Sequence, residues 1–308
     1  MNGYLAAAVA VLIWSAYPVA TRAGVTGSFA PQELVVLRFG VGALLFLPYL
    51  LLHCRAIKPK AWLQGVPLMV FQGAGMGALV IWGLQLAPAN HQAALGPGVN
   101  VAWVALLGFL IFARKPSARL VIGALLCASG VLLIAWWSLS ARNSTVLAGD
   151  AMFLAASALG ALYVLQLRSW GVGAIQGAAI VTLYSALVVV PWHLWSSPAP
   201  LWRVAPLELL WQVLWQGVLI GCVAFIALNH AIAKLGAERS SAMVALVPVL
   251  TASLALIFLG EVPSPAEIAA FLAISAGVSI AASRGYAGKP AANSAPMKRS
   301  ACGLSRPG

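Results

Sequence analysis

Long apolar stretches separated by short polar connections run from residue 3 to residue 283 of the chain. A helix needs about 20 apolar residues to cross the hydrocarbon core of a bilayer. Helices are expected because lipid offers no hydrogen-bond partner to an open backbone. The predicted spans are 3–22, 31–52, 63–86, 91–113, 118–137, 149–167, 172–192, 207–229, 240–260 and 265–283. The pattern therefore predicts an all-α integral membrane protein with ten transmembrane helices.

Composition supports a lipid environment. Of the 308 residues, 62% are hydrophobic and 8% are charged, whereas soluble globular proteins average about 45–50% apolar and about 25% charged residues. So few charges could not cover a surface that faces water. After residue 284 the sequence becomes polar and basic, and the segment 285–308 is predicted to be a disordered cytoplasmic tail.

Lys and Arg are unevenly distributed between alternate connections, within a net charge of +12. With the N-terminus placed inside, the inner connections and the tail hold fourteen bases, and the outer connections hold only Arg142 and Arg203. The positive-inside rule then predicts that both termini face the cytoplasm. Orientation accounts for the basic charge, so no nucleic-acid partner is expected. Five of the six acids fall at predicted outer span ends, namely Glu33, Asp150, Glu208, Glu261 and Glu267.

The two halves of the chain share a spacing pattern that indicates an internal repeat. In the first span of each half a Tyr precedes an Arg by five residues, and in the last span a Pro precedes a Gly by fourteen. The matched pairs, offset by 146–147 residues, are Tyr17 with Tyr163, Arg22 with Arg168, Pro116 with Pro263 and Gly130 with Gly277. Five spans is an odd number, so the second half is inverted, which suits alternating access. We predict repeats at 1–140 and 141–284.

Several short motifs occur in a fixed order along the chain: Ile13-Trp14-Ser15, Arg38-Phe39, Gly149-Asp150, Ala245-Leu246-Val247-Pro248-Val249, Leu259-Gly260-Glu261 and Gly277-Val278. Over residues 3–283 this order resembles EamA-type ten-helix transporters of the drug/metabolite transporter superfamily. The resemblance implies an inner-membrane exporter of small metabolites, with a cavity between the inverted halves. The first half departs from the family pattern, because Arg114 stands where an acid often ends span 4 and Pro97 lies about one turn early.

Polar and aromatic side chains at membrane depth are the candidates for substrate contact, because polar groups are costly in lipid unless paired or facing water. Arg38 lies about 10 Å along its helix from Pro31 and suits a carboxylate; snorkelling, or a pair with Glu33 or Asp150, is the structural alternative. For the amides the alternative is hydrogen bonding between helices, and for the aromatic rings it is packing. The predicted substrate-binding residues are Trp14, Tyr17, Arg38, Gln72, Asn100, Trp103, Tyr163 and Gln216.

The sequence holds no nucleophile motif, Walker loop or metal-ligand spacing, so no catalytic residue, metal or cofactor is expected. His91 and His230 are predicted to be interfacial, and Glu261 to be a cap or hinge partner. The leading interpretation is a secondary transporter that exports small metabolites such as amino acids by alternating access, with a small-molecule substrate and the bilayer as partners. The alternatives are an importer of a vitamin or nucleoside-like solute, a channel, and a membrane scaffold or enzyme. Energy coupling and a homodimer are left open.

Overall fold

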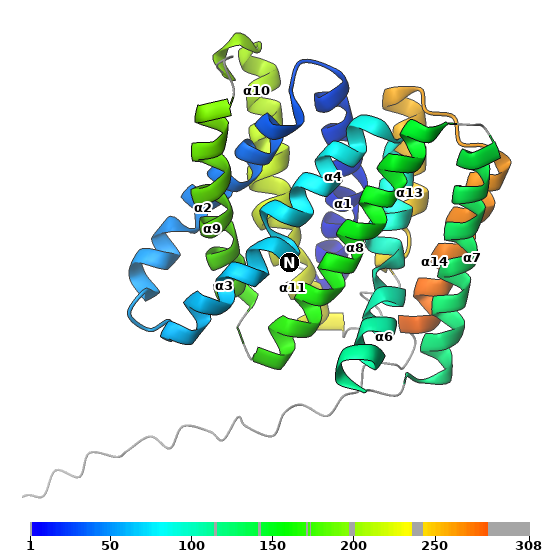
Figure 1. The fold of residues 1–308 in the computed structure, drawn as a ribbon, viewed down its shortest axis with the longest axis horizontal. Helices are drawn as coiled ribbons and strands as arrows, with labels where there is room; N and C mark the ends of the chain where they lie inside the picture. Colours follow the sequence, from blue (N-terminus) through cyan, green and yellow to red (C-terminus); the bar gives the residue numbers. More distant parts are fainter. Residues whose placement is uncertain are drawn as a thin grey trace, which may run out of the picture.

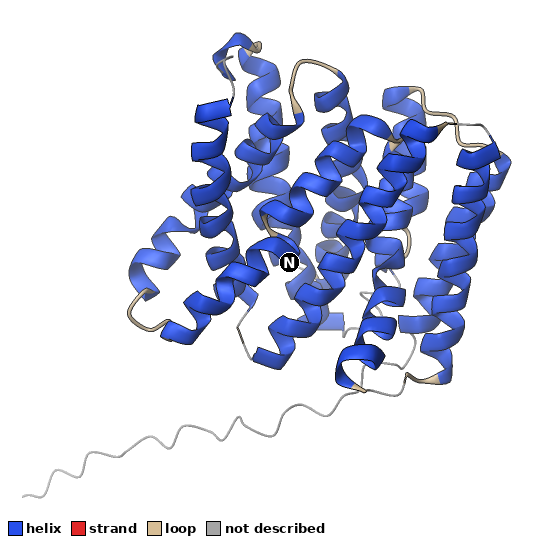
Figure 2. Ribbon diagram, in the orientation of Figure 1, coloured by secondary structure: helices blue, strands red, loops and turns tan. Residues whose placement is uncertain are grey.

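The computed structural model describes residues 2–113, 116–140, 143–170, 172, 174–196, 201–235 and 243–282. Every regular element in these ranges is a helix (Figure 2). Within these described ranges, eight segments are long and apolar enough to cross a membrane, and two shorter apolar helices accompany them. These ten segments confirm the predicted all-α membrane fold. The predicted tail at 285–308 and the start of the predicted span 240–260 lie outside the described residues.

The helices follow one another in the order of the predicted spans (Figure 1). The first half contains α1 (Gly3–Thr26), α2 (Pro31–His53), α3 (Pro59–Gln72), α4 (Ala74–Leu86), α5 (Ala89–Ala93), η1 (Ala94–Gly98), α6 (Val99–Phe112) and α7 (Ala118–Ser140). The second contains α8 (Ser144–Trp170), α9 (Ala174–Ser196), η2 (Leu201–Arg203), α10 (Pro206–Gln212), η3 (Val213–Val223), α11 (Ala224–Leu235), α13 (Val247–Leu259) and α14 (Pro265–Ala282).

Two predicted helix starts were several residues late, for local reasons. The span predicted at 63 begins at Pro59, because a proline lacks the N–H that the first helical position leaves unbonded. The span predicted at 149 begins at Ser144, because the Asn143 side chain accepts a hydrogen bond from the Val146 N–H at 3.2 Å. This contact satisfies one of the free amides at the start of α8.

Spans 3, 4 and 8 are each interrupted rather than continuous. Span 3 is broken at Gly73, whose backbone is not helical and which separates α3 from α4. Span 4 consists of α5, the π-helical turn η1 and α6, and span 8 consists of α10, the π-helical η3 and α11. Spans 3 and 8 correspond under the repeat, so both halves contain an interrupted third span. Interrupted helices at membrane depth are typical of transporter binding regions.

Contacts between α7 and α14 show that the repeats are related by a two-fold axis. These helices lie side by side along their lengths at one edge of the bundle (Figure 1). A Cβ atom on Gly277 would lie 2.8 Å from Cys127 Sγ, and one on Gly130 would lie 2.5 Å from Ile274 Cγ1. The offset of 147 residues converts Gly130 into Gly277 and Cys127 into Ile274, so each contact is the image of the other. Reciprocal contacts of this kind are the product of an inverted repeat.

The other helix pairs are exchanged by the same operation. The packing of α4 on α8 corresponds to that of α11 on α1, and the packing of α6 on α8 corresponds to that of α13 on α1. The contact of α3 with α9 corresponds to that of η3 with α2, whereas the α2–α9 pair maps onto itself. The two inverted halves therefore form one interlocked bundle.

Large apolar side chains cover the outside of this bundle. In a water-soluble protein an exposed apolar surface of this extent would promote aggregation, but in a bilayer it faces acyl chains. Examples with more than 60% exposure are Leu44, Leu52, Leu125, Leu132, Leu194, Trp195, Ile257 and Phe258.

Candidate functional site

The π-helical turn η1 interrupts span 4 at the sequence Gly96-Pro97-Gly98. Pro97 has no N–H, so the ladder of helical hydrogen bonds is broken there. The Ser157 hydroxyl of α8 donates to the Gly96 carbonyl at 2.6 Å, and the Asn100 amide donates to the Ser157 carbonyl at 3.0 Å. Two hydrogen bonds thus fix the interrupted helix against α8, as backbone at membrane depth requires.

Gly160 of α8 is the point at which two predicted site residues come together. A Cβ atom on Gly160 would lie 3.2 Å from Asn100 Nδ2, 3.7 Å from Met76 Sδ and 3.8 Å from Gln72 Oε1. Helices α3, α4, α6 and α8 therefore converge here, and the absence of a side chain at Gly160 leaves room beside both amides. Asn100 and Gln72 are both half-buried.

Arg38 of α2 is paired with Tyr17 of α1, another predicted site residue. Its Nη1 atom donates to the Tyr17 hydroxyl at 2.5 Å, and its guanidinium carbon lies 5.1 Å from the Tyr17 ring centroid and 5.7 Å from that of Phe39. A pair of this arginine with Glu33 or Asp150, one of the alternatives weighed, is wrong, because the structure pairs Glu33 with Arg203 and Asp150 with a histidine. A guanidinium has five N–H donors, and the hydrogen bond to Tyr17 uses one of them.

The remaining four predicted residues lie in three different environments. Trp14 and Trp103 pack against the same apolar core as Tyr17, and the Trp103 indole N–H is buried without a hydrogen-bond partner in the described residues. Tyr163 instead packs in a separate cluster around Leu68. Gln216 is fully buried, and its amide donates to a threonine hydroxyl of α1 at 2.9 Å, which is the interhelical contact that the sequence left open.

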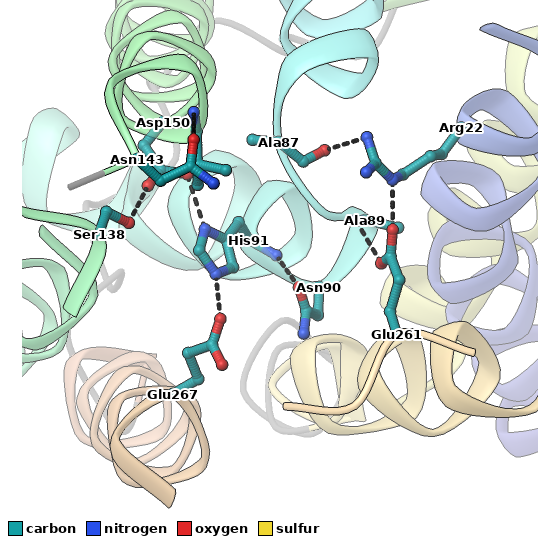
Figure 3. Close-up of polar contacts among 11 residues, drawn as sticks. Arg22, Ala87, Ala89, Asn90, His91, Ser138, Asn143, Asp150, Glu261 and Glu267 are labelled. Atoms are coloured by element: carbon teal, nitrogen blue, oxygen red, sulfur yellow. Dashed lines mark hydrogen bonds and ion pairs between the residues drawn. The ribbon is translucent and has the colours of Figure 1, made fainter. Parts of the chain in front are cut away.

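Arg22 and Glu261 connect the two halves at the end of the bundle where the α4–α5 and α13–α14 connections meet (Figure 3). The Arg22 guanidinium, besides its ion pair with Glu261, donates to the carbonyls of Leu84 at 2.6 Å and Ala87 at 2.8 Å. The Glu261 carboxylate also accepts the Ala89 N–H at 2.9 Å. One ion pair therefore fastens the α4–α5 connection to α1 and to the second half. The predicted hinge or cap role of Glu261 agrees with these contacts.

His91 of α5 forms a second connection at the same end of the bundle. Its ring lies between Asp150 of α8 and Glu267 of α14 (Figure 3). The prediction that His91 is interfacial was wrong, because the residue is 1% exposed. The sequence placed all three residues near outer span ends but gave no signal that they meet, since their separations of 59 and 176 positions are bridged only by the packing of the helices.

A cavity of about 660 Å³ lies between the end of α1 and α10. Its wall is mainly apolar. Lining residues such as Leu207 and Trp211 are exposed, so the cavity opens to the surface of the bundle. Its lining includes none of the eight predicted substrate residues. A cavity lined by those predicted residues stays a prediction.

Comparisons with known proteins agree with this architecture. A "Probable terminal-alkyne amino-acid exporter" from Streptantibioticus cattleyicolor is 26% identical over 222 residues, which cover 68% of this chain and 69% of that protein. A solved structure described as "Crystal structure of protein" shares the fold with a TM-score of 0.60 and 22% identity, and the match covers 91% of this chain and 96% of that one.

The model of the EamA-like transporter family matches the chain twice, over residues 1–136 and 147–283. The two matches are displaced by 146 residues, the offset found between the repeats. Together they leave little of the chain outside the family, and they indicate a transporter rather than an enzyme. The chain therefore belongs to the EamA-like transporter family.

Proposed function

We propose that this protein is a secondary transporter that exports amino acids or similar small metabolites by alternating access between its two inverted repeats. The observation that carries the proposal is the closure at one end of the bundle, where Arg22 and the α4–α5 connection of the first half are held by Glu261 of the second. Polar groups such as Arg38 and Asn100 lie at span positions further from this end. An end closed by breakable polar contacts above a buried polar region is an arrangement suited to alternating access.

The side chains gathered in the interior favour an amino acid as the substrate class. The Arg38 guanidinium suits a carboxylate, because it offers several donors in one plane. The amides of Gln72 and Asn100 supply acceptors for an ammonium group, and the Trp14 and Trp103 rings supply apolar surface for a side chain. The relative from Streptantibioticus cattleyicolor, named as an amino-acid exporter, supports the same class.

We further propose that the protein lies in the cytoplasmic membrane with both termini inside, which places the Arg22–Glu261 closure at the outer face. The excess of Lys and Arg in the inner connections supports this orientation. Cysteine labelling of intact cells tests it. In a background without other cysteines, Val262→Cys in the exposed α13–α14 connection should react with an impermeant maleimide. The exposed native Cys54, at the other end of α2, should react only after permeabilisation.

Efflux from proteoliposomes tests the function itself. Vesicles loaded with labelled amino acids should lose them faster with the protein than without it, and unlabelled substrate outside should accelerate the exchange. A parallel panel of nucleosides and flavins covers the vitamin and nucleoside alternative. Binding of a true substrate should also raise the apparent melting temperature of the purified protein. Failure of every amino acid in both assays would contradict the substrate class.

A further inference from the structure

His91 joins three helices through two carboxylates in the interior of the protein. Its Nδ1 atom lies 2.8 Å from Asp150 Oδ1, and its Nε2 atom lies 2.5 Å from Glu267 Oε1. The three side chains are 2%, 5% and 10% exposed, respectively. Charged groups at this depth are expected to be functional or tightly paired, and this site has two acids for one base.

Counting hydrogens shows that this site holds a proton in addition to that of a neutral histidine. Both ring nitrogens are at hydrogen-bond distance from a carboxylate oxygen, and each contact needs a hydrogen, but a neutral imidazole carries only one. The other carboxylate oxygens already accept hydrogen bonds: Ser138 Oγ donates to Asp150 at 3.1 Å, and the Ser264 N–H donates to Glu267 at 2.6 Å. The additional proton therefore lies within one of the two His91–carboxylate contacts.

Loss of this proton would leave a lone pair of the ring facing a carboxylate oxygen. The buried site would then carry two uncompensated negative charges instead of one, which is unfavourable away from water. The contact of His91 with either α8 or α14 would have to open or admit water. Because α14 belongs to the second half and His91 to the first, an opening on the Glu267 side separates the halves at the end that Arg22 and Glu261 also close.

In the described part of the chain, four helices supply the polar groups that contact the ring or its two carboxylates. They are Asp150 from α8, Ser138 from α7, Glu267 and Ser264 at the start of α14, and Asn90 on α5 itself, whose side chain accepts the His91 N–H at 2.8 Å. Among the described residues, the charged Arg22–Glu261 pair lies close by, because Glu261 accepts the N–H of Ala89, two residues before His91.

We propose that His91, Asp150 and Glu267 form a proton-binding site, and that the bound proton holds α5, α8 and α14 together at this end of the bundle. Release of the proton favours opening of this end. The site therefore makes the transport cycle sensitive to pH. This consequence rests on the proposed function, whereas the binding of the proton and the closure of this end do not depend on it.

Nuclear magnetic resonance of the histidine rings tests proton binding without any substrate. The native protein with ¹⁵N-labelled histidine is placed in nanodiscs, and His91→Gln identifies the signals of this ring. We expect these signals to change between about pH 5 and pH 10, and to change differently in Glu267→Gln, which removes one acid but keeps the size of the side chain. Ring signals of His91 that stay constant across this range would overturn the proposal.

Distances between spin labels test the effect of the proton on closure. The labels are placed at Ser144→Cys, at the exposed start of α8, and at Val262→Cys, in the exposed α13–α14 connection. The distance distribution should shift or broaden as the pH rises, and this response should be lost in His91→Gln or, if that variant fails to fold, in Glu267→Gln. A distribution independent of pH in the native protein would overturn the proposal. Positive results in both experiments with no efflux of any solute would instead reject the transport function alone.

Discussion

Arg22 and Glu261 are 239 positions apart in the chain, yet their side chains form an ion pair that encloses the α4–α5 connection. The guanidinium binds the carbonyls of Leu84 and Ala87, and the carboxylate binds the N–H of Ala89. Both partners are largely buried, with side-chain exposures of 19% and 15%. A short piece of backbone between two helices is thus held from the first half and from the second half together.

Replacement of Glu261 by Gln should weaken this closure. Arg22 would lose its ion pair, and a hydrogen bond to a charged group contributes about 1.5–3 kcal/mol. We expect the apparent melting temperature of the purified protein to fall and a cysteine at Ala89 to react faster with an impermeant reagent. Glu208→Gln, which changes an exposed carboxylate in the first turn of α10, is the matched control and should alter neither quantity. Equal behaviour of the two variants would show that the pair is dispensable.

Arg38→Gln should reduce the transport of substrates that carry a carboxylate. The expected loss of about 1.5–3 kcal/mol of charge-assisted hydrogen bonding corresponds to about 10–150-fold in the apparent affinity. Efflux of the matching amino-acid amides should change much less. Tyr17→Phe removes only the partner of Arg38 and should produce a smaller decrease. An equal loss for acids and amides would assign Arg38 a structural role instead.

Side chains introduced at Gly160 should obstruct the region between Gln72 and Asn100. The Cβ of Gly160→Ala would meet Asn100 Nδ2 at 3.2 Å, a close contact that a flexible amide can relieve by a small shift. The branched side chain of Gly160→Val extends further into the space between the amides. We expect Gly160→Ala to retain most of its efflux, and Gly160→Val to lose substrate-induced stabilisation while keeping a native melting temperature without substrate. Full activity of the valine variant would exclude this region from the pathway.

Gly277→Ala should destabilise the contact between α7 and α14. The new methyl group would lie 2.6 Å from the Gly123 carbonyl oxygen and 2.8 Å from Cys127 Sγ, so the helices would have to separate, at a typical cost of about 1–3 kcal/mol. Thermal unfolding in detergent measures the effect. Gly108→Ala is the control, because its Cβ would have only an ordinary contact with Leu165 at 3.8 Å and alanine is the better helix former. A stable Gly277→Ala protein would contradict the close packing described here.

The number and order of the spans could be predicted because hydropathy is a local property that the bilayer thickness converts into helix length. The repeat could be predicted for a related reason, since the same spacings recur at one offset. Helix ends were less accurate where a single polar residue decided them, as Asn143 does for α8. The π-helical turn at Gly96-Pro97-Gly98 follows from a proline that the sequence displays, but its hydrogen bonds to Ser157 depend on the neighbouring helix.

The polar connections were predictable only in part. The concentration of acids at one end was visible from the sequence, and four of those five acids make ion pairs there or nearby. Which base meets which acid was not visible, because partners such as His91 and Glu267 lie on helices from different halves. Arg38 illustrates the same limit: two acids were considered as its partners, and the structure pairs it with the hydroxyl of Tyr17.

The contact of Gly130 with Ile274 and the contact of Gly277 with Cys127 are images of each other under the repeat. If the two halves exchange conformations during a cycle, each of these two contacts takes the geometry of the other. The packing of α7 against α14 as a whole then stays the same. The α7–α14 pair would then act as a stationary pivot. The Arg22–Glu261 pair has no such image, because Arg114 stands at the position that corresponds to Glu261. In the proposed cycle the two ends of the pathway would therefore be closed by different chemistry, and the two end states should differ in resting population.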